Sequence, residues 1–207
     1  MNSPRTPVVR VDPKDPDEAA ISRAARIIMA GGLVIFPTET VYGIAADALN
    51  DSSIARLYEV KGRPCNKPFT LHVSNIGMVL NSGAEITAKA KKLIDRYWPG
   101  PLTIILRTKD GRTTGFRMPA HKVALKLIER CGVPVVAPSA NLSGNQPPTD
   151  AHAALKELDG SVDLVLDAGK TEVGVESTVI DMTTDAPKIL RQGAISRPEI
   201  ETEIGSF

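Results

Sequence analysis

The sequence predicts one α/β domain with a twisted, mixed sheet flanked by helices. Helical patterns and short apolar runs alternate along the whole chain, and no long linker, internal repeat or low-complexity tract interrupts them. The chain has 207 residues, 42% of them hydrophobic. A chain of this length buries roughly 70% of the surface that its unfolded form exposes, so a compact fold needs no disulfide or metal.

The N-terminal part of the chain sets the start of this domain. Residues 1–14 are polar and rich in proline, so we expect a flexible arm, or an edge strand at 8–11, before a domain that spans residues 15–207. Asp15 is expected to cap the first helix, which Gly31-Gly32 ends. The apolar run 33–36, bounded by glycine and proline, predicts a buried strand.

The alternation continues to the C-terminus. Helical spacing predicts helices at 52–60, 87–97, 120–130 and, capped by Thr149, 149–158. Short apolar runs predict strands at 102–106, 133–137, 162–166, 178–181 and 188–190. Residues 108–115 are polar and turn-rich, and we expect a loop there, with a strand towards Arg117.

Charge and cysteine content exclude several classes of protein. The net charge is +1, so an anion would have to bind at a local cluster of basic residues. Cys65 and Cys131 form no Cys-x-x-Cys motif, which argues against a disulfide scaffold or structural zinc. The N-terminus lacks the apolar stretch of a secretory signal, and no apolar run reaches the ~20 residues of a membrane span. We expect a soluble cytoplasmic protein that does not contact a membrane.

Polar, glycine-containing segments lie between the expected helices and strands. Taken singly each could be an ordinary loop, but several directly follow a strand, where open α/β sheets bind ligands. Together they predict the lining of a cleft. The segments begin at Pro37, Lys61, Trp98, Arg117, Ala137, Val173 and Ile189.

Lys61, Arg63 and Lys67 form the densest basic cluster, in an expected loop. Pro64 favours extended backbone at Arg63, and in extended backbone positions i and i+2 point the same way. Two cations on one side can bind a polyphosphate, with the arginine as a planar fork and the lysine as a point charge. A solvated basic loop is the alternative.

Ser139 and Asn141 share the same i, i+2 spacing just after an expected strand. A hydroxyl and an amide there could orient a ligand without adding charge. One alternative is an ordinary Asx or Ser turn. Another is the glycosylation sequon that Asn141 begins, which the expected lack of a signal peptide argues against.

Other familiar motifs are not supported. Residues 168–171 read Ala-Gly-Lys-Thr like the end of a P-loop, but Leu164 stands where its first glycine is needed. No Gly-x-Ser-x-Gly elbow is present. The histidines at 72, 121 and 152 have no partners that a sequence identifies as a triad or metal set. His72 is the one that lies just after the basic cluster.

Taken in order, PTETVYG, Lys-x-Arg, RMP, PSANLSG, ESTV and ILRQG resemble the YrdC-like threonylcarbamoyl-AMP synthase family from about residue 15 to residue 205. The resemblance implies a twisted α/β catalytic domain with a positively charged central cavity, in its single-domain form. It implies a nucleotidyltransferase that makes L-threonylcarbamoyladenylate from ATP, L-threonine and bicarbonate, releasing pyrophosphate. Mg²⁺ would come with ATP, with no metal site formed by the protein alone. The product would serve tRNA threonylcarbamoyladenosine modification through a downstream transferase complex.

The resemblance also assigns residues. Its catalytic tetrad matches Lys61, Arg63, Ser139 and Asn141. Its nucleotide site matches Arg63, Lys67, Thr113, Asn141, Thr149 and Arg191, of which Thr113 depends on the length of the loop before Arg117. Its threonine site matches Thr40, His72, Arg117, Ser139 and Ser177.

Two alternatives stay open on the sequence. One is a related protein that binds nucleotide or RNA without threonine activity. The other is a double-stranded RNA or tRNA binding module. The near-neutral charge argues against strong RNA binding, whereas a basic cavity mouth allows weak tRNA binding.

Overall fold

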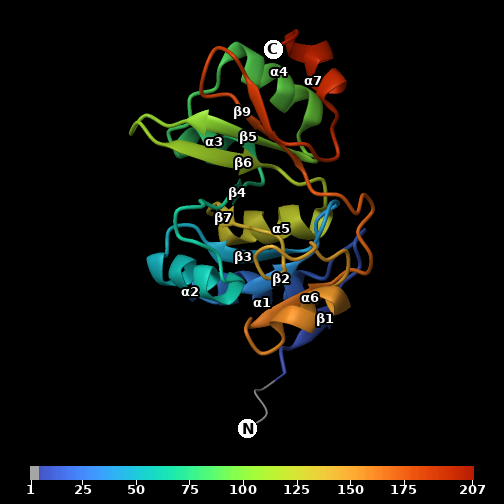
Figure 1. The fold of residues 1–207 in the computed structure, drawn as a ribbon. Helices are drawn as coiled ribbons and strands as arrows, with labels where there is room; N and C mark the ends of the chain where they lie inside the picture. The colour runs from blue at the N-terminus through green and yellow to red at the C-terminus, as the bar shows by residue number, and fades with distance from the viewer. Residues whose placement is uncertain (1–4) are drawn as a thin grey trace.

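The computed structural model describes residues 5–207, which fold around one ten-stranded sheet (Figure 1). Its helices are α1 (Glu18–Met29), α2 (Asp51–Lys61), α3 (Ile76–Asn81), α4 (Ala88–Tyr97), α5 (Lys122–Cys131), α6 (Ala151–Leu158) and α7 (Arg197–Ile204). Its strands are β1 (Val8–Arg10), β2 (Val34–Phe36), β3 (Gly43–Asp47), β4 (Leu71–His72), β5 (Leu102–Arg107), β6 (Thr113–Arg117), β7 (Val135–Val136), β8 (Leu164–Asp167), β9 (Thr178–Asp181) and β10 (Lys188–Arg191). None of the helices in residues 5–207 is long and apolar enough to cross a bilayer.

The sheet is mixed, as the sequence predicts. Its strands lie in the order β1-β8-β2-β3-β7-β4-β6-β5-β9-β10. The pairs β1–β8, β2–β8, β4–β6 and β5–β9 are parallel, and the pairs β2–β3, β3–β7, β4–β7, β5–β6 and β9–β10 are antiparallel. The short strands β7 and β4 at the middle of this order join its two halves (Figure 1).

Helices cover both faces of the first half of the sheet. Along β2, Val34 and Phe36 belong to the apolar cluster that α1 and α5 complete. Ile35, between them, belongs to the cluster that α2 and α6 complete. This is the alternation expected of a strand buried on both faces. A third cluster packs α4 and α7 against β5 and β9.

The N-terminal segment is part of the sheet. Val8–Arg10 pairs in parallel with β8, and Val11 is buried in the first cluster. The expected edge strand is therefore confirmed, and the expectation that the domain begins only at residue 15 is wrong. Residues 1–4 of the expected arm lie outside the described residues.

Two helix caps differ from the prediction by one or two residues. The side chain of Asp17, not Asp15, accepts a hydrogen bond from the amide of Ala20 at the start of α1. Similarly Asp150, not Thr149, caps α6. In both places the side chain of the N-cap residue accepts a hydrogen bond from the backbone amide three residues later. The predicted cap residues lie one or two positions too early to make this bond.

Candidate functional site

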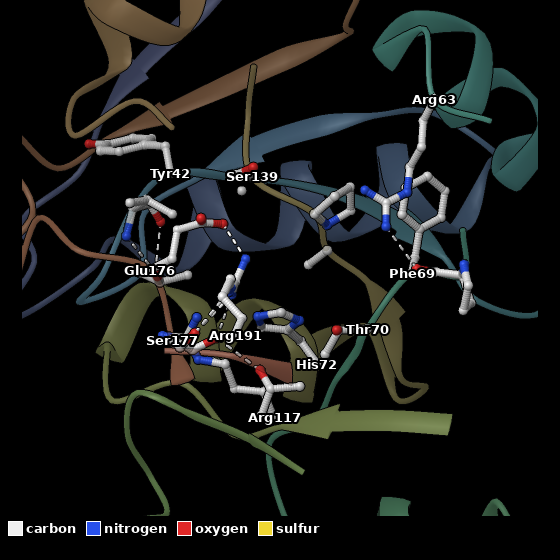
Figure 2. A pocket seen from close by; sticks show the side chains of 17 residues that line it. Tyr42, Arg63, Phe69, Thr70, His72, Arg117, Ser139, Glu176, Ser177 and Arg191 are labelled. Carbon is white, nitrogen blue, oxygen red and sulfur yellow. Dashed lines mark hydrogen bonds and ion pairs between the residues drawn. The ribbon is translucent and has the colours of Figure 1, made fainter. Parts of the chain in front are cut away.

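Two adjoining pockets open near the centre of the sheet. The first is lined by Arg63, Arg117 and Arg191, together with Glu176 (Figure 2). Lys61 lines the second pocket, and Arg63 and Glu176 line both pockets. Four cationic side chains therefore line the pockets beside one carboxylate, which makes this a positively charged site despite the near-neutral chain.

Lys61 is the last residue of α2 rather than part of an extended loop. The helix ends at Gly62, whose φ of 56° is the left-handed value that glycine adopts without strain. The Lys61 ammonium donates to the carbonyl oxygens of Ser139 at 2.5 Å and Asn141 at 2.6 Å. Burial, and then the neighbouring Arg63, lower the pKa of Lys61 to about 8. Lys61 thus joins α2 to the segment that carries Ser139 and Asn141.

Arg63 organises the loop that follows α2. Its Nε donates to the carbonyl of Lys67 at 2.9 Å, and its Nη2 donates to that of Pro68 at 3.1 Å. The guanidinium lies 5.1 Å from the centre of the Phe69 ring. Although the backbone is not extended from Lys61 to Arg63, both side chains line the second pocket, as the sequence predicts.

Ser139 and Asn141 also line the second pocket. The amide nitrogen of Asn141 donates to the carbonyls of Leu142 at 2.8 Å and Asn145 at 2.9 Å. These bonds do not form the Asx or Ser turn that was the alternative for this segment, because Oδ1 of Asn141 accepts no hydrogen bond within residues 5–207.

Arg117 ends β6 at the floor of the first pocket and is 5% exposed. Its Nη2 donates to Oγ1 of Thr40 at 2.8 Å and lies 2.8 Å from Oε1 of Glu39. Its Nε donates to the carbonyl of Gly100 at 3.3 Å. The RMP segment therefore places a buried guanidinium in the pocket, backed by a carboxylate.

His72 lies beside Arg117 because β4 pairs with β6 in register. Burial, and then the Arg117 charge, lower the pKa of His72 to about 3. The imidazole is therefore neutral at physiological pH, and it lines the first pocket without adding charge (Figure 2).

A further part of the wall of the first pocket comes from Ser177, just before β9, and Arg191, at the end of β10. Ser177 shares a hydrogen bond of 2.9 Å with Thr103, and Arg191 donates to the Ser177 carbonyl from Nε at 3.1 Å and Nη2 at 2.9 Å. Nη1 of Arg191 lies 2.5 Å from Oε1 of Glu176. Glu176 was not predicted as a site residue, although its segment was, because a single glutamate in a loop carries no spacing signal.

Four predicted site residues lie outside the pocket linings. Thr40 is buried behind Arg117, so it contacts the site through that residue. Lys67 contributes its carbonyl to Arg63. Thr113 begins β6, and four residues of strand place it about 13 Å from Arg117. Thr149 lies two residues beyond Pro147, which lines the second pocket. The structure does not bring Lys67, Thr113 and Thr149 into the pocket walls.

The fold and the site define a class: an α/β protein with a mixed sheet and a pair of adjoining pockets lined by cationic side chains. A family model named Sua5_yciO_yrdC, described as "Telomere recombination", matches residues 26–193. The chain therefore belongs to the Sua5/YciO/YrdC family, which confirms the resemblance that the motifs indicated.

Similar proteins carry a common name. A Pyrococcus abyssi protein called threonylcarbamoyl-AMP synthase is 44% identical over 92% of this chain, and a Bacillus subtilis protein of that name is 40% identical over 99%. The chain spans 59% and 62% of the length of these two relatives. A crystal structure of P. abyssi Sua5 complexed with L-threonine superimposes with a TM-score of 0.92 at 42% identity, covering 97% of this chain and 61% of that one.

Proposed function

We propose that the protein is an L-threonylcarbamoyladenylate synthase that uses ATP, L-threonine and bicarbonate or CO₂ and releases pyrophosphate. The observation that carries this proposal is the pair of adjoining pockets, which share Arg63, Ser139 and Glu176. One holds the buried guanidinium of Arg117, suited to a carboxylate, and the other holds Lys61 and Arg63, suited to phosphates. The names of the relatives and the threonine complex of P. abyssi Sua5 support the same substrates.

The reaction needs alignment rather than a protein nucleophile. The neutral amine of threonine forms the carbamate in one of two ways. It adds to CO₂ and releases a proton to solvent, or it reacts with bicarbonate and its proton leaves as part of a water molecule. A carbamate oxygen then bonds to the α-phosphorus of ATP while the bond from that phosphorus to the bridging oxygen of the β-phosphate breaks, and pyrophosphate leaves. Such a displacement is accelerated by holding the two reactants together and neutralising phosphate charge.

The described residues can supply both functions. Arg117 would hold the threonine carboxylate, with Ser177 and the neutral His72 as polar neighbours in the same pocket. Lys61 and Arg63 would hold the phosphates, together with Arg191, which pairs with the Glu176 that both pockets share. Mg²⁺ bound with ATP would add charge neutralisation, and Asn141 and Glu176 offer oxygen atoms that suit it.

Labelled bicarbonate tests the proposal. With ATP, Mg²⁺ and threonine present, the label should enter a product that contains both adenylate and threonine. Entry of the label without threonine, or no entry in the complete mixture, would contradict it. The product would then pass to a transferase that modifies tRNA, which we propose as the downstream partner.

RNA binding without threonine activity makes a different prediction. Affinity for RNA should fall with salt, with a log–log slope of about −0.7 to −0.9 for each phosphate contact. Turnover of the small substrates should depend on salt far less. A steep salt slope for tRNA together with no use of threonine would favour that alternative, and weak tRNA binding beside full activity would fit a basic cleft mouth.

A further inference from the structure

Glu176 is the carboxylate that both pockets share. Its side chain is 33% exposed and points towards the middle of the site, where Nη1 of Arg191 lies 2.5 Å from Oε1 (Figure 2). A carboxylate in a phosphate pocket repels its ligand unless a cation lies between them. Arg191 supplies one such charge, yet it also donates to the backbone of Ser177.

Asn141, which also lines the second pocket, has a side-chain oxygen with no hydrogen-bond partner within residues 5–207. Both hydrogens of the Asn141 amide nitrogen are used by the carbonyls of Leu142 and Asn145, and this fixes the orientation of the side chain. Oδ1 of Asn141 is buried and accepts no hydrogen bond from residues 5–207. Buried polar atoms are almost always satisfied, so this oxygen of a pocket-lining residue needs a partner that residues 5–207 do not supply.

We propose that Glu176 and Oδ1 of Asn141 bind the divalent cation that accompanies ATP, an inference that rests on the proposed function. Carboxylate and amide oxygens are the hard ligands that Mg²⁺ prefers, and Mg²⁺ is commonly held by one or two carboxylates together with substrate phosphates. In the described part of the chain, no group of three or more His, Cys, Asp and Glu side chains could hold a metal ion by itself. On this proposal the cation would bind together with the nucleotide, and phosphate oxygens and water would complete its coordination.

This role gives Glu176 opposite effects with and without metal. Without a divalent cation, its charge opposes the triphosphate, so Glu176→Gln should leave ATP affinity unchanged or raise it. With Mg²⁺, the same substitution removes a ligand of the cation, so the gain in affinity that Mg²⁺ provides should shrink. If Glu176 served only to position Arg191, Glu176→Gln would instead weaken ATP binding both with and without Mg²⁺.

Calorimetric titration of ATP in the absence of threonine tests the proposal, once with excess Mg²⁺ and once with EDTA. We expect Glu176→Gln to reduce the Mg²⁺-dependent gain about tenfold or more, since a lost contact to a charged group typically has this effect. Paramagnetic resonance of Mn²⁺ in place of Mg²⁺ should show correspondingly less bound metal in the presence of ATP. Glu172→Gln is the matched control, because it removes the same charge four residues away, outside both pockets.

The outcomes separate the two proposals. If the unmodified protein binds no ATP in either condition, the proposed function is wrong. If it binds ATP with a gain from Mg²⁺ that Glu176→Gln keeps in full, the metal role is wrong and the proposed function stands. Glu176→Asp, which keeps the carboxylate, should retain part of the gain and decides the question if the glutamine variant is unstable. An aspartate variant no better than alanine at this position would overturn the proposal.

Discussion

Nη2 of Arg117 lies 2.8 Å from Oε1 of Glu39, and both side chains are buried, at 6% and 5% exposed. Neither carboxylate oxygen of Glu39 has a well-aligned hydrogen bond within residues 5–207, so charge rather than hydrogen-bond geometry holds the pair. Removing one member of a buried ion pair leaves the charge of the other buried and unpaired, which destabilises the fold. Arg117 is therefore both a structural partner of Glu39 and one of the cations that line the first pocket.

Arg117→Lys should weaken threonine binding and lower stability together. The planar guanidinium of Arg117 contacts Thr40 and Glu39 and can at the same time bind the carboxylate of threonine. A lysine ammonium cannot reproduce this geometry. We expect the Kd for threonine to rise about 10- to 150-fold, the loss typical of one charged hydrogen bond. ATP binding should change less than threefold. Calorimetric titration of each ligand, with a melting curve, measures all three effects.

Glu39→Gln is the informative companion to that variant. It keeps the shape of the side chain but removes the charge that faces Arg117, so stability should fall while the guanidinium stays in the pocket. Threonine binding should therefore suffer less than in Arg117→Lys. If instead Arg117→Lys weakened ATP binding more than threonine binding, the proposal that Arg117 binds the threonine carboxylate would be refuted.

Lys61→Ala and Arg63→Ala should separate stability from ligand binding. The Lys61 ammonium is the donor to two carbonyls, and its removal should cost roughly 1–3 kcal/mol of unfolding free energy. The carbonyls that Arg63 contacts are solvent-exposed, so its removal should change stability by less than about 0.5 kcal/mol. Both variants should bind ATP more weakly, by about tenfold or more. Denaturant titration and calorimetry check these effects, and equal stabilities for the two variants would contradict the structural role of Lys61.

His72 should make the protein less stable in mild acid. Its pKa is lowered to about 3 in the folded state, whereas in the unfolded chain the imidazole takes up a proton as the pH falls through about 6.5. Between these values the unfolded state binds more protons, so stability falls as the pH falls. From pH 7 to pH 5 we expect the unmodified protein to lose about 2 kcal/mol more than His72→Gln. Denaturant titration at the two values measures this, with the exposed His152 as the control position; a parallel loss in the His72 variant would show that His72 is not the cause.

The parts of the fold with strong periodicity were predictable from sequence. Helices α1, α2, α4 and α5 have apolar residues at helical spacing and clear stop signals, and the structure confirms them. By contrast β3 was not predicted, because its GIAAD sequence is short and rich in small residues. The helix α7 was also missed, since the amphipathic pattern of its eight residues is weak and its capping box at Ser196 was not recognised. The strand β6 has a glycine in the middle and two threonines at its start, so its sequence alone resembles a loop; pairing with β5 makes it a strand.

The site was predictable where one segment carries both members of a pair. Lys61 with Arg63, and Ser139 with Asn141, follow from spacing along the chain and line the second pocket together. The pairing of Glu39 with Arg117 and the place of Glu176 across both pockets depend on strand order, which no local pattern reports. The nucleotide positions Thr113 and Thr149 rest on the resemblance alone, and Lys67 on the resemblance and the basic cluster; all three stay predictions to be tested by substitution.

Pyrophosphate release from ATP tests the proposed function most directly. Purified protein with ATP, Mg²⁺, L-threonine and bicarbonate should release pyrophosphate. Omission of threonine, or removal of bicarbonate and CO₂, should each reduce the release to the level without protein, because the carbamate is the group that attacks the α-phosphate. Equal release with threonine left out would contradict the assignment of this site to threonylcarbamoyladenylate synthesis.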